Sequence, residues 1–270
     1  STNVLKSESH EPSADILRQA SEVLRGGGLV CFPTETVYGL GARADHAGAM
    51  EKLRAVKTRE ASKAFTVHVA SREDMRRFAP DLPRMAARLA RKAWPGPLTL
   101  IVPVEDPSAA PVMAGLNGSA AAAMYYDNTI GMRCPDDPFA QALLRAVDAP
   151  IVASSANLAG EPPPWTGQDV VKSLSGRVDL IVDAGRTKYA KPSTIVRVNG
   201  DSVEVLREGV FDAGSVERLS TVRILFVCSG NTCRSPMAEK LAEAILAERL
   251  GCAPKELARY GVRVCSAGTS

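Results

Sequence analysis

Short apolar segments recur along this chain, with polar loops between them, and this alternation limits its fold more than any other feature. Runs rich in Val, Ile, Leu and Phe predict strands at Leu29–Phe32, Phe65–Val69, Thr129–Cys134, Ile151–Ser154, Leu180–Asp183, Ser193–Val198 and Val203–Leu206. Apolar residues at helical spacing predict helices at Ala14–Arg25, Ala47–Val56, Pro83–Ala93 and Pro138–Val147. Helices mixed with many short strands favour an α/β or α+β sheet domain that ends near residue 212.

Two segments lack such a core pattern. Residues Glu105–Ala123 are rich in Ala, Gly, Ser and Pro, so we expect a flexible loop there. Residues 213–221 are short and polar and predict a linker between a first domain, at 12–212, and a second segment. That second segment, residues 222–270, repeats strand, loop, helix and strand, which is a partial βαβ unit.

Composition and cysteine spacing exclude several classes of protein. The net charge of +3 neither requires nor excludes a nucleic-acid partner. No apolar run approaches the roughly 20 residues of a transmembrane helix, and the first residues do not resemble a signal peptide, so we expect a cytoplasmic protein without membrane contact. The 6 cysteines form no paired CxxC motifs, so we expect reduced thiols and no metal site.

Polar clusters follow several of the expected strands. They comprise Thr34, Glu35, Thr36 and Tyr38; Lys57, Arg59, Lys63 and His68; Thr129 and Arg133; Ser154, Ser155 and Asn157; and Ser193, Thr194 and Arg207. Polar loops at strand ends are where open sheets bind ligands, and cations beside short hydroxyl and amide groups suit a polyanion such as ATP. The competing interpretation is solvated surface charges, a structural His68, and turn-forming Ser155 and Asn157.

Longer motifs run through the same clusters. In chain order they are PTETVYGLG (33–41), K-x-R followed by Lys (Lys57, Arg59, Lys63), WPGPLTL (94–100), TIGMRCP (129–135), S-x-N (Ser155, Asn157), PSTI (192–195) and LREG (206–209). In order and spacing they resemble the YrdC family of threonylcarbamoyl-AMP synthases, over roughly residues 12 to 212. The resemblance implies a YrdC-like twisted mixed sheet with helices around an open basic cleft. It also implies that L-threonine, bicarbonate and ATP are condensed to threonylcarbamoyl-AMP, with release of pyrophosphate, for modification of a tRNA adenosine.

The same resemblance implies roles for individual residues. L-Threonine would be held by Thr36, His68, Arg133 and Ser193. ATP would contact Arg59, Lys63, Thr129, Ser155, Asn157 and Arg207, with Lys57 and Arg59 as catalytic cations. Mg²⁺ is expected on the phosphates of ATP, and tRNA or double-stranded RNA and a threonylcarbamoyl-transferase protein are expected partners. Glu60 and Ala64 stand where the family usually has Pro, and we expect the Glu60 carboxylate to weaken phosphate binding.

A different motif follows the expected linker. Residues 228–235 read C-x₅-R-S between a predicted strand and helix, and SAGT follows at 266–269. Backbone N–H groups of such a loop bind an anion and lower the pKa of the cysteine thiol. The segment resembles the low-molecular-weight protein tyrosine phosphatases, which implies Cys228 as nucleophile and Arg234 as phosphate ligand. That family takes its general acid from an Asp-Pro motif that would lie beyond residue 270, so we expect phosphate binding without turnover.

Three functions are therefore weighed. The motifs favour synthesis of threonylcarbamoyl-AMP. The alternatives are an RNA-binding module of the same fold without catalysis, and phosphotyrosine phosphatase activity of the second segment within a longer chain. Pyrophosphate release that requires threonine, salt-sensitive tRNA binding without product, and aryl phosphate hydrolysis lost in Cys228→Ser would distinguish them.

Overall fold

The computed structural model describes residues 1–8, 10–11, 13–58, 60 and 63–269. The strands up to residue 207 are β1 (Asn3–Lys6), β2 (Val30–Phe32), β3 (Gly39–Arg43), β4 (Thr66–His68), β5 (Leu98–Pro103), β6 (Tyr125–Tyr126), β7 (Thr129–Arg133), β8 (Ile151–Ser155), β9 (Leu180–Asp183), β10 (Thr194–Asn199) and β11 (Ser202–Arg207). The helices up to residue 220 are α1 (Ala14–Arg25), α2 (Ala47–Lys57), α3 (Met75–Phe78), α4 (Arg84–Ala93), α5 (Gly118–Met124), α6 (Pro138–Ala146), α7 (Gly167–Leu174) and α8 (Ala213–Ser220).

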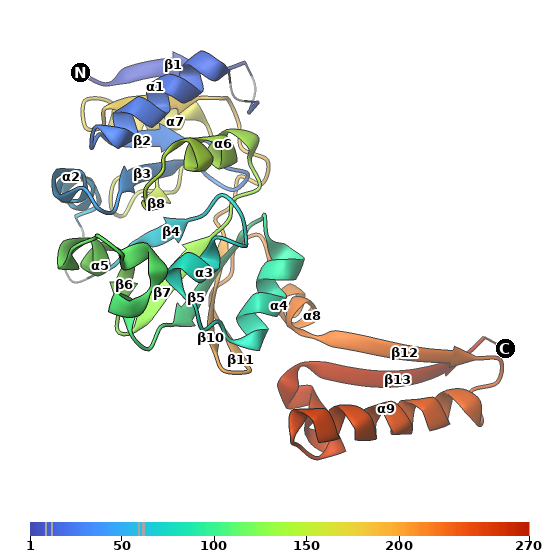
Figure 1. Cartoon of the computed structure of the whole chain (residues 1–270). Coiled ribbons are helices and arrows are strands. Elements are labelled where there is room, and N and C mark those ends of the chain that lie inside the picture. Colours follow the sequence, from blue (N-terminus) through green and yellow to red (C-terminus); the bar gives the residue numbers. More distant parts are fainter. Residues whose placement is uncertain (9, 12, 59, 61–62, 270) are drawn as a thin grey trace.

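These strands form one mixed sheet, with helices packed along it (Figure 1). Its order is β1-β9-β2-β3-β8-β4-β7-β5-β10-β11, and β6 pairs with β7. Strand β4 runs antiparallel to β8 and parallel to β7, and this register places His68 opposite Arg133. The predicted α/β class is confirmed, and the mixed strand directions bring clusters far apart in sequence to neighbouring positions in the sheet.

Helix α1 shows how local sequence sets an element. The Ser13 hydroxyl accepts a hydrogen bond from the backbone N–H of Ile16, and Gly26 ends the helix, so the predicted bounds are confirmed. Ala20 and Leu24 are fully buried on the face that packs against the sheet and against α6. The helix is therefore held by its cap and by one apolar stripe.

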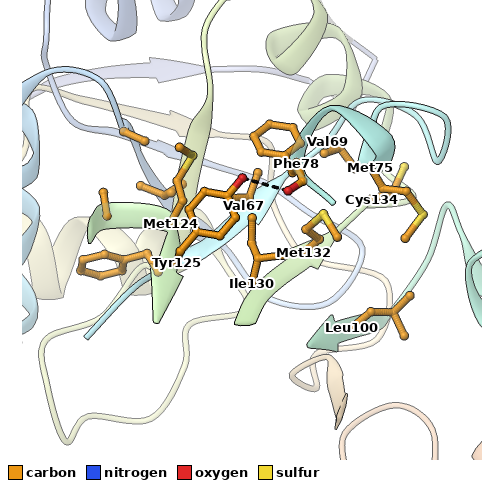
Figure 2. Packing of buried hydrophobic residues seen from close by; sticks show 14 of the residues in the cluster. Val67, Val69, Met75, Phe78, Leu100, Met124, Tyr125, Ile130, Met132 and Cys134 are labelled. Atoms are coloured by element: carbon orange, nitrogen blue, oxygen red, sulfur yellow. Dashed lines mark hydrogen bonds between the residues drawn. The ribbon is translucent and has the colours of Figure 1, made fainter. Parts of the chain in front are cut away.

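One hydrophobic core, part of which is drawn in Figure 2, joins segments between Leu29 and Val216, and a second core packs α1 and α6 against the sheet. Val67 of β4 and Met132 of β7 pack in the first core, and the Tyr125 hydroxyl donates a hydrogen bond of 2.9 Å to the Phe78 carbonyl. Burial raises the pKa of Tyr125 to about 12. A buried phenol needs such a partner, so this bond fixes α3 against the end of α5.

The flexible loop expected at Glu105–Ala123 is wrong. These residues form the 3₁₀ turns η1 (Pro107–Ala109) and η2 (Pro111–Met113) and most of α5, which the Asn117 side chain caps. Val112 and Ala120 are buried in the core. Small residues here allow close packing, so an Ala- and Gly-rich composition was misread as a lack of structure.

Residues 213–221 also differ from the expected linker. They form α8, which Asp212 caps and which buries Val216 against α4. Further differences concern the first domain: β1, β6 and α7 were not predicted, and β3 begins within the PTETVYGLG motif. None of the helices in the described part of the chain is both long and apolar enough to span a bilayer.

Residues 222–269 form a small unit of two strands and two helices, called the second unit below. It consists of β12 (Val222–Cys228), α9 (Arg234–Leu250), the 3₁₀ helix η3 (Pro254–Tyr260) and β13 (Val262–Gly268). Strands β12 and β13 pair in parallel and form their own two-stranded sheet, next to α8 in Figure 1. The predicted βαβ unit is confirmed.

Candidate active site

A cavity of about 480 Å³ lies between the loop after β2 and strands β4, β5, β7, β8 and β10. Its walls include, among the residues predicted from sequence, Lys63, His68, Thr129, Arg133, Ser155, Ser193 and Arg207. Thr36, Lys57 and Asn157 are absent from its walls, and the predicted Arg59 lies outside the described residues. No Asp or Glu is present among the described lining residues, so these walls favour an anion.

Arg133 and Glu35 form a buried ion pair at this cavity. The Arg133 Nη2 atom lies 2.8 Å from Glu35 Oε1, and the two side chains are only 6% and 2% exposed. Both carboxylate oxygens, and Nε and Nη2 of Arg133, nevertheless lack an aligned hydrogen bond. The attraction is therefore electrostatic, and the pair retains polar capacity for a ligand. Glu35 was noted in the sequence cluster but was not given a role.

His68 is buried beside this pair and lines the cavity. Burial and then the charge of Arg133 lower the pKa of His68 to about 3, although the Thr66 carbonyl at 3.2 Å from Nδ1 acts in the opposite direction. The imidazole is consequently neutral at physiological pH and offers one donor and one acceptor. A neutral ring next to a buried guanidinium suits recognition of a small zwitterion better than binding of a second anion.

A hydroxyl pair forms another part of the wall. Thr99 Oγ1 and Ser193 Oγ are 2.9 Å apart, and Arg207 Nη2 donates a hydrogen bond of 2.8 Å to the Ser193 carbonyl. Burial, followed by the charge of Arg133, lowers the pKa of Arg207. Sequence reasoning missed Thr99, although a polar residue between Leu98 and Leu100 in an apolar strand is a usable signal.

The two threonines of the PTET motif lie in different places relative to the cavity. Thr36 is fully buried and its hydroxyl lies 3.0 Å from Thr34 Oγ1, whereas Thr34 lines the cavity. The Thr34 hydroxyl donates to the Val37 carbonyl at 2.7 Å, so the proton between the two threonines must come from Thr36. Thr36 thus supports the loop from behind.

A second layer of contacts holds the same loop, and sequence reasoning did not find it. The Thr187 hydroxyl donates to the Thr36 carbonyl at 2.8 Å, and the Tyr189 N–H donates to the Glu35 carbonyl at 2.8 Å. The Tyr38 hydroxyl donates to Gly185 O at 2.8 Å. Residues 185–189 therefore fix the backbone of the PTET loop over a long sequence separation.

Lys63 lies close to Glu60, the acidic residue at a position where the family usually has Pro. Its Nζ atom lies 3.4 Å from Glu60 Oε2, and the two side chains are 55% and 69% exposed. Such an exposed pair is worth only about 0–1 kcal/mol, so it weakly competes with a phosphate for Lys63. Within the described residues, no three His, Cys, Asp or Glu side chains group as in a metal site.

The cysteine loop of the second unit is ordered for anion chemistry. Cys228 Sγ lies 2.9 Å from Ser235 Oγ and accepts a hydrogen bond of 3.2 Å from the Asn231 N–H. These contacts, with that of Ser235 the largest, lower the pKa of Cys228 to about 7. Arg234, expected in the loop before the helix, is the first residue of α9.

Comparison with known proteins found two family matches in this chain. Residues 22–209 match the model of the Sua5/YciO/YrdC family, described as "Telomere recombination", and residues 223–270 match low molecular weight phosphotyrosine protein phosphatases. Sua5 of Pyrococcus abyssi has a similar structure, with a TM-score of 0.71 at 27% identity, over 92% of this chain and 76% of that chain.

Two curated relatives are named for the same activity. The threonylcarbamoyl-AMP synthase of Bacillus subtilis is 37% identical over 74% of this chain and 55% of its own length. That of Pyrococcus abyssi is 33% identical over 75% of this chain and 56% of its own length. This chain thus spans about half the length of these relatives. Since the family match extends over most of the chain, from residue 22 to residue 209, the chain belongs to the Sua5/YciO/YrdC family.

Proposed function

We propose that the first domain synthesises threonylcarbamoyl-AMP from L-threonine, bicarbonate and ATP. The single observation that carries this proposal is a cavity lined by the buried Arg133, the neutral His68 and the cations Lys63 and Arg207. None of the described residues that line it is Asp or Glu. That combination suits an amino acid next to a polyphosphate. Relatives named for this activity support the proposal, and Pyrococcus abyssi Sua5 has been crystallised with L-threonine.

In this proposal, different residues of the cavity bind threonine and the nucleotide. Arg133 binds the threonine carboxylate, while His68 and the Thr99–Ser193 hydroxyl pair orient the rest of the amino acid. The nucleotide is bound by Lys63, Thr129, Ser155 and Arg207, together with Arg59. Thr36 acts through the PTET loop.

The proposed reaction needs positioning and charge neutralisation more than covalent help. The threonine amine attacks bicarbonate, a C–N bond forms, and water leaves to give the N-carboxylate. A carboxylate oxygen of this carbamate then attacks the α-phosphorus in line, and pyrophosphate leaves. Lys63 and Arg207 offset the charge that develops on the phosphates. Mg²⁺ fits as an ion that enters on ATP, because the described walls offer hydroxyl oxygens but no carboxylate.

Mass spectrometry tests the proposal. The protein is mixed with ATP, L-threonine and bicarbonate, and threonylcarbamoyl-AMP is expected only in the complete mixture. Pyrophosphate release that is unchanged without threonine would overturn it. In calorimetry, Arg133→Ala should weaken threonine binding more than ATP binding, and Lys63→Ala should do the reverse. We place the reaction in the cytoplasm, with a transferase protein and tRNA as downstream partners.

The environment of Cys228 supports a second, separate proposal for residues 222–270. A thiol with a pKa near 7, in a loop before a long helix, suits binding of a phosphate monoester. Aryl phosphate hydrolysis abolished by Cys228→Ser would show turnover. Phosphate protection of Cys228 from alkylation without hydrolysis would show binding alone.

A further inference from the structure

Lys57, the last residue of α2, directs its ammonium group at the backbone of the S-x-N loop. Its Nζ atom donates to the Ser155 carbonyl at 3.0 Å, to the Asn157 carbonyl at 2.7 Å and to Asn157 Oδ1 at 3.1 Å. A lysine ammonium has three N–H donors. Its donors can therefore serve these three carbonyl and amide oxygens, and Lys57 is not among the described residues that line the cavity.

Asn157, the partner of Lys57 in this contact, makes further hydrogen bonds through its side chain. Asn157 is 6% exposed, and its side-chain Nδ2 donates to the carbonyls of Leu158, at 3.0 Å, and Glu161. The amide oxygen faces the ammonium and the amide nitrogen faces the two carbonyls, so the hydrogen-bond network fixes the orientation of the amide. Like Lys57, Asn157 does not line the cavity.

Ser155 is the member of this group that reaches the cavity. Its backbone carbonyl is fixed by Lys57, and the next N–H, of Ala156, donates to the Tyr38 carbonyl at 2.8 Å. The Ser155 hydroxyl therefore projects from a residue whose following peptide unit is held at both its carbonyl and its N–H. A loop without these restraints would sample other orientations and would bind its ligand with an entropic penalty.

We propose that Lys57 and Asn157 are positioning residues that form one unit, the Lys57–Asn157 brace, and act on the nucleotide through Ser155. The proposal rests on the proposed use of ATP in this cavity. It departs from the expectation that Lys57 is a catalytic cation and that Asn157 contacts ATP directly. If both residues were direct ATP ligands, the effects of their substitutions on ATP binding would multiply. If they form one brace, replacing either residue should have nearly the full effect of replacing both.

The test combines a double-mutant cycle with hydrogen exchange on the full chain. Lys57→Met, Asn157→Ala and the double variant are each expected to raise KM for ATP about tenfold, a typical loss for one displaced contact, while KM for threonine stays unchanged. The double variant should be no worse than the more impaired single variant within about twofold. In the absence of ligand, amides 155–158 should exchange faster in all three. Lys52→Met on the same helix, whose side chain is 55% exposed, is the matched control and should change nothing.

Two results would overturn the brace. One is multiplicative losses in the cycle with unchanged exchange at 155–158, which identifies two independent phosphate ligands. The other is an equal rise in both KM values, which identifies a general loss of structure. If Lys57→Met does not fold, Lys57→Gln serves with the same readouts. The exchange measurement needs no turnover, so faster exchange in a protein that makes no threonylcarbamoyl-AMP would reject the proposed function and keep the brace.

Discussion

At the scale of single residues, Glu35 matters for stability because it is the buried counter-charge of Arg133. Removing one partner of a buried pair leaves the other charge uncompensated, which typically costs about 3–5 kcal/mol. We therefore expect Glu35→Gln to lower the free energy of unfolding by about 3 kcal/mol in urea titrations. The double change Glu35→Gln with Arg133→Met removes both charges and should recover much of this loss. Equal destabilisation by single and double variants would contradict the assignment.

Cys228 gives a residue-scale prediction in the second unit. Because its pKa is about 7, alkylation by iodoacetamide should rise with a midpoint near pH 7, as read by mass spectrometry of its peptide. The buried Cys134, whose pKa is raised to about 12, should stay unmodified over the same range. Ser235 is the largest cause of the Cys228 shift, so Ser235→Ala should move the midpoint upward. A midpoint that stays in place in Ser235→Ala would show that the loop amides dominate instead.

At the scale of elements, the segment after β1 is attached to the start of α6. His10 Nδ1 contacts the carboxylate of Asp137, the residue that caps α6 by accepting from the Ala140 N–H at 2.9 Å. This contact raises the pKa of His10 above its ordinary value. A raised folded-state pKa stabilises the fold fully below the unfolded-state value of about 6.5, and the contribution is lost as pH rises through the higher folded value.

The pH dependence of unfolding checks this attachment. The wild type should lose up to about 1 kcal/mol between pH 6 and pH 8.5 from this group, a modest amount because the imidazole is partly solvated. His10→Gln should remove that difference and leave the rest of the profile in place. A pH profile that is identical in wild type and variant would rule out the His10–Asp137 contact as its source.

The elements also show why sequence reasoning succeeded in some places and failed in others. Helix α1 was predicted to the residue because Ser13 and Gly26 mark its ends chemically. Helix α5 was missed because its stability comes from tertiary burial of alanines, which local composition does not reveal. The two short strands β1 and β3 were missed for a related reason, since each is defined by its neighbour in the sheet.

For the candidate site, motifs located the cavity but did not assign every role. Arg133 and Ser193, which the motifs predict to hold threonine, line this cavity, and their roles in binding stay predictions. Lys57 and Asn157 were not distinguishable from direct ligands, since only the three-dimensional path of the loop shows that they bond to each other.

At the scale of the whole molecule, one arginine joins the two units. Arg88 Nη1 of α4 lies within hydrogen-bond distance of three carbonyls, of Ser220 at 2.8 Å, Tyr260 at 3.1 Å and Gly261 at 3.0 Å. Lys92 Nζ adds a bond of 2.7 Å to the Thr221 carbonyl. These carbonyls lie at or just after the ends of α8 and η3, where backbone acceptors have no helical partner and a cation is favourable.

We expect Arg88→Ala to loosen the second unit while it leaves the first intact. Amides near 220–222 and 260–262 should exchange faster, and the second unit should be cleaved earlier by a protease, because this small two-stranded sheet has few buried residues of its own. Calorimetric unfolding of the first domain should shift little. Arg91→Ala, an exposed neighbour on the same helix, is the matched control and should leave exchange unchanged. If Arg88→Ala and Arg91→Ala behave alike, the bond from Lys92 to Thr221 and the apolar packing of α8 on α4 hold the two units together without Arg88.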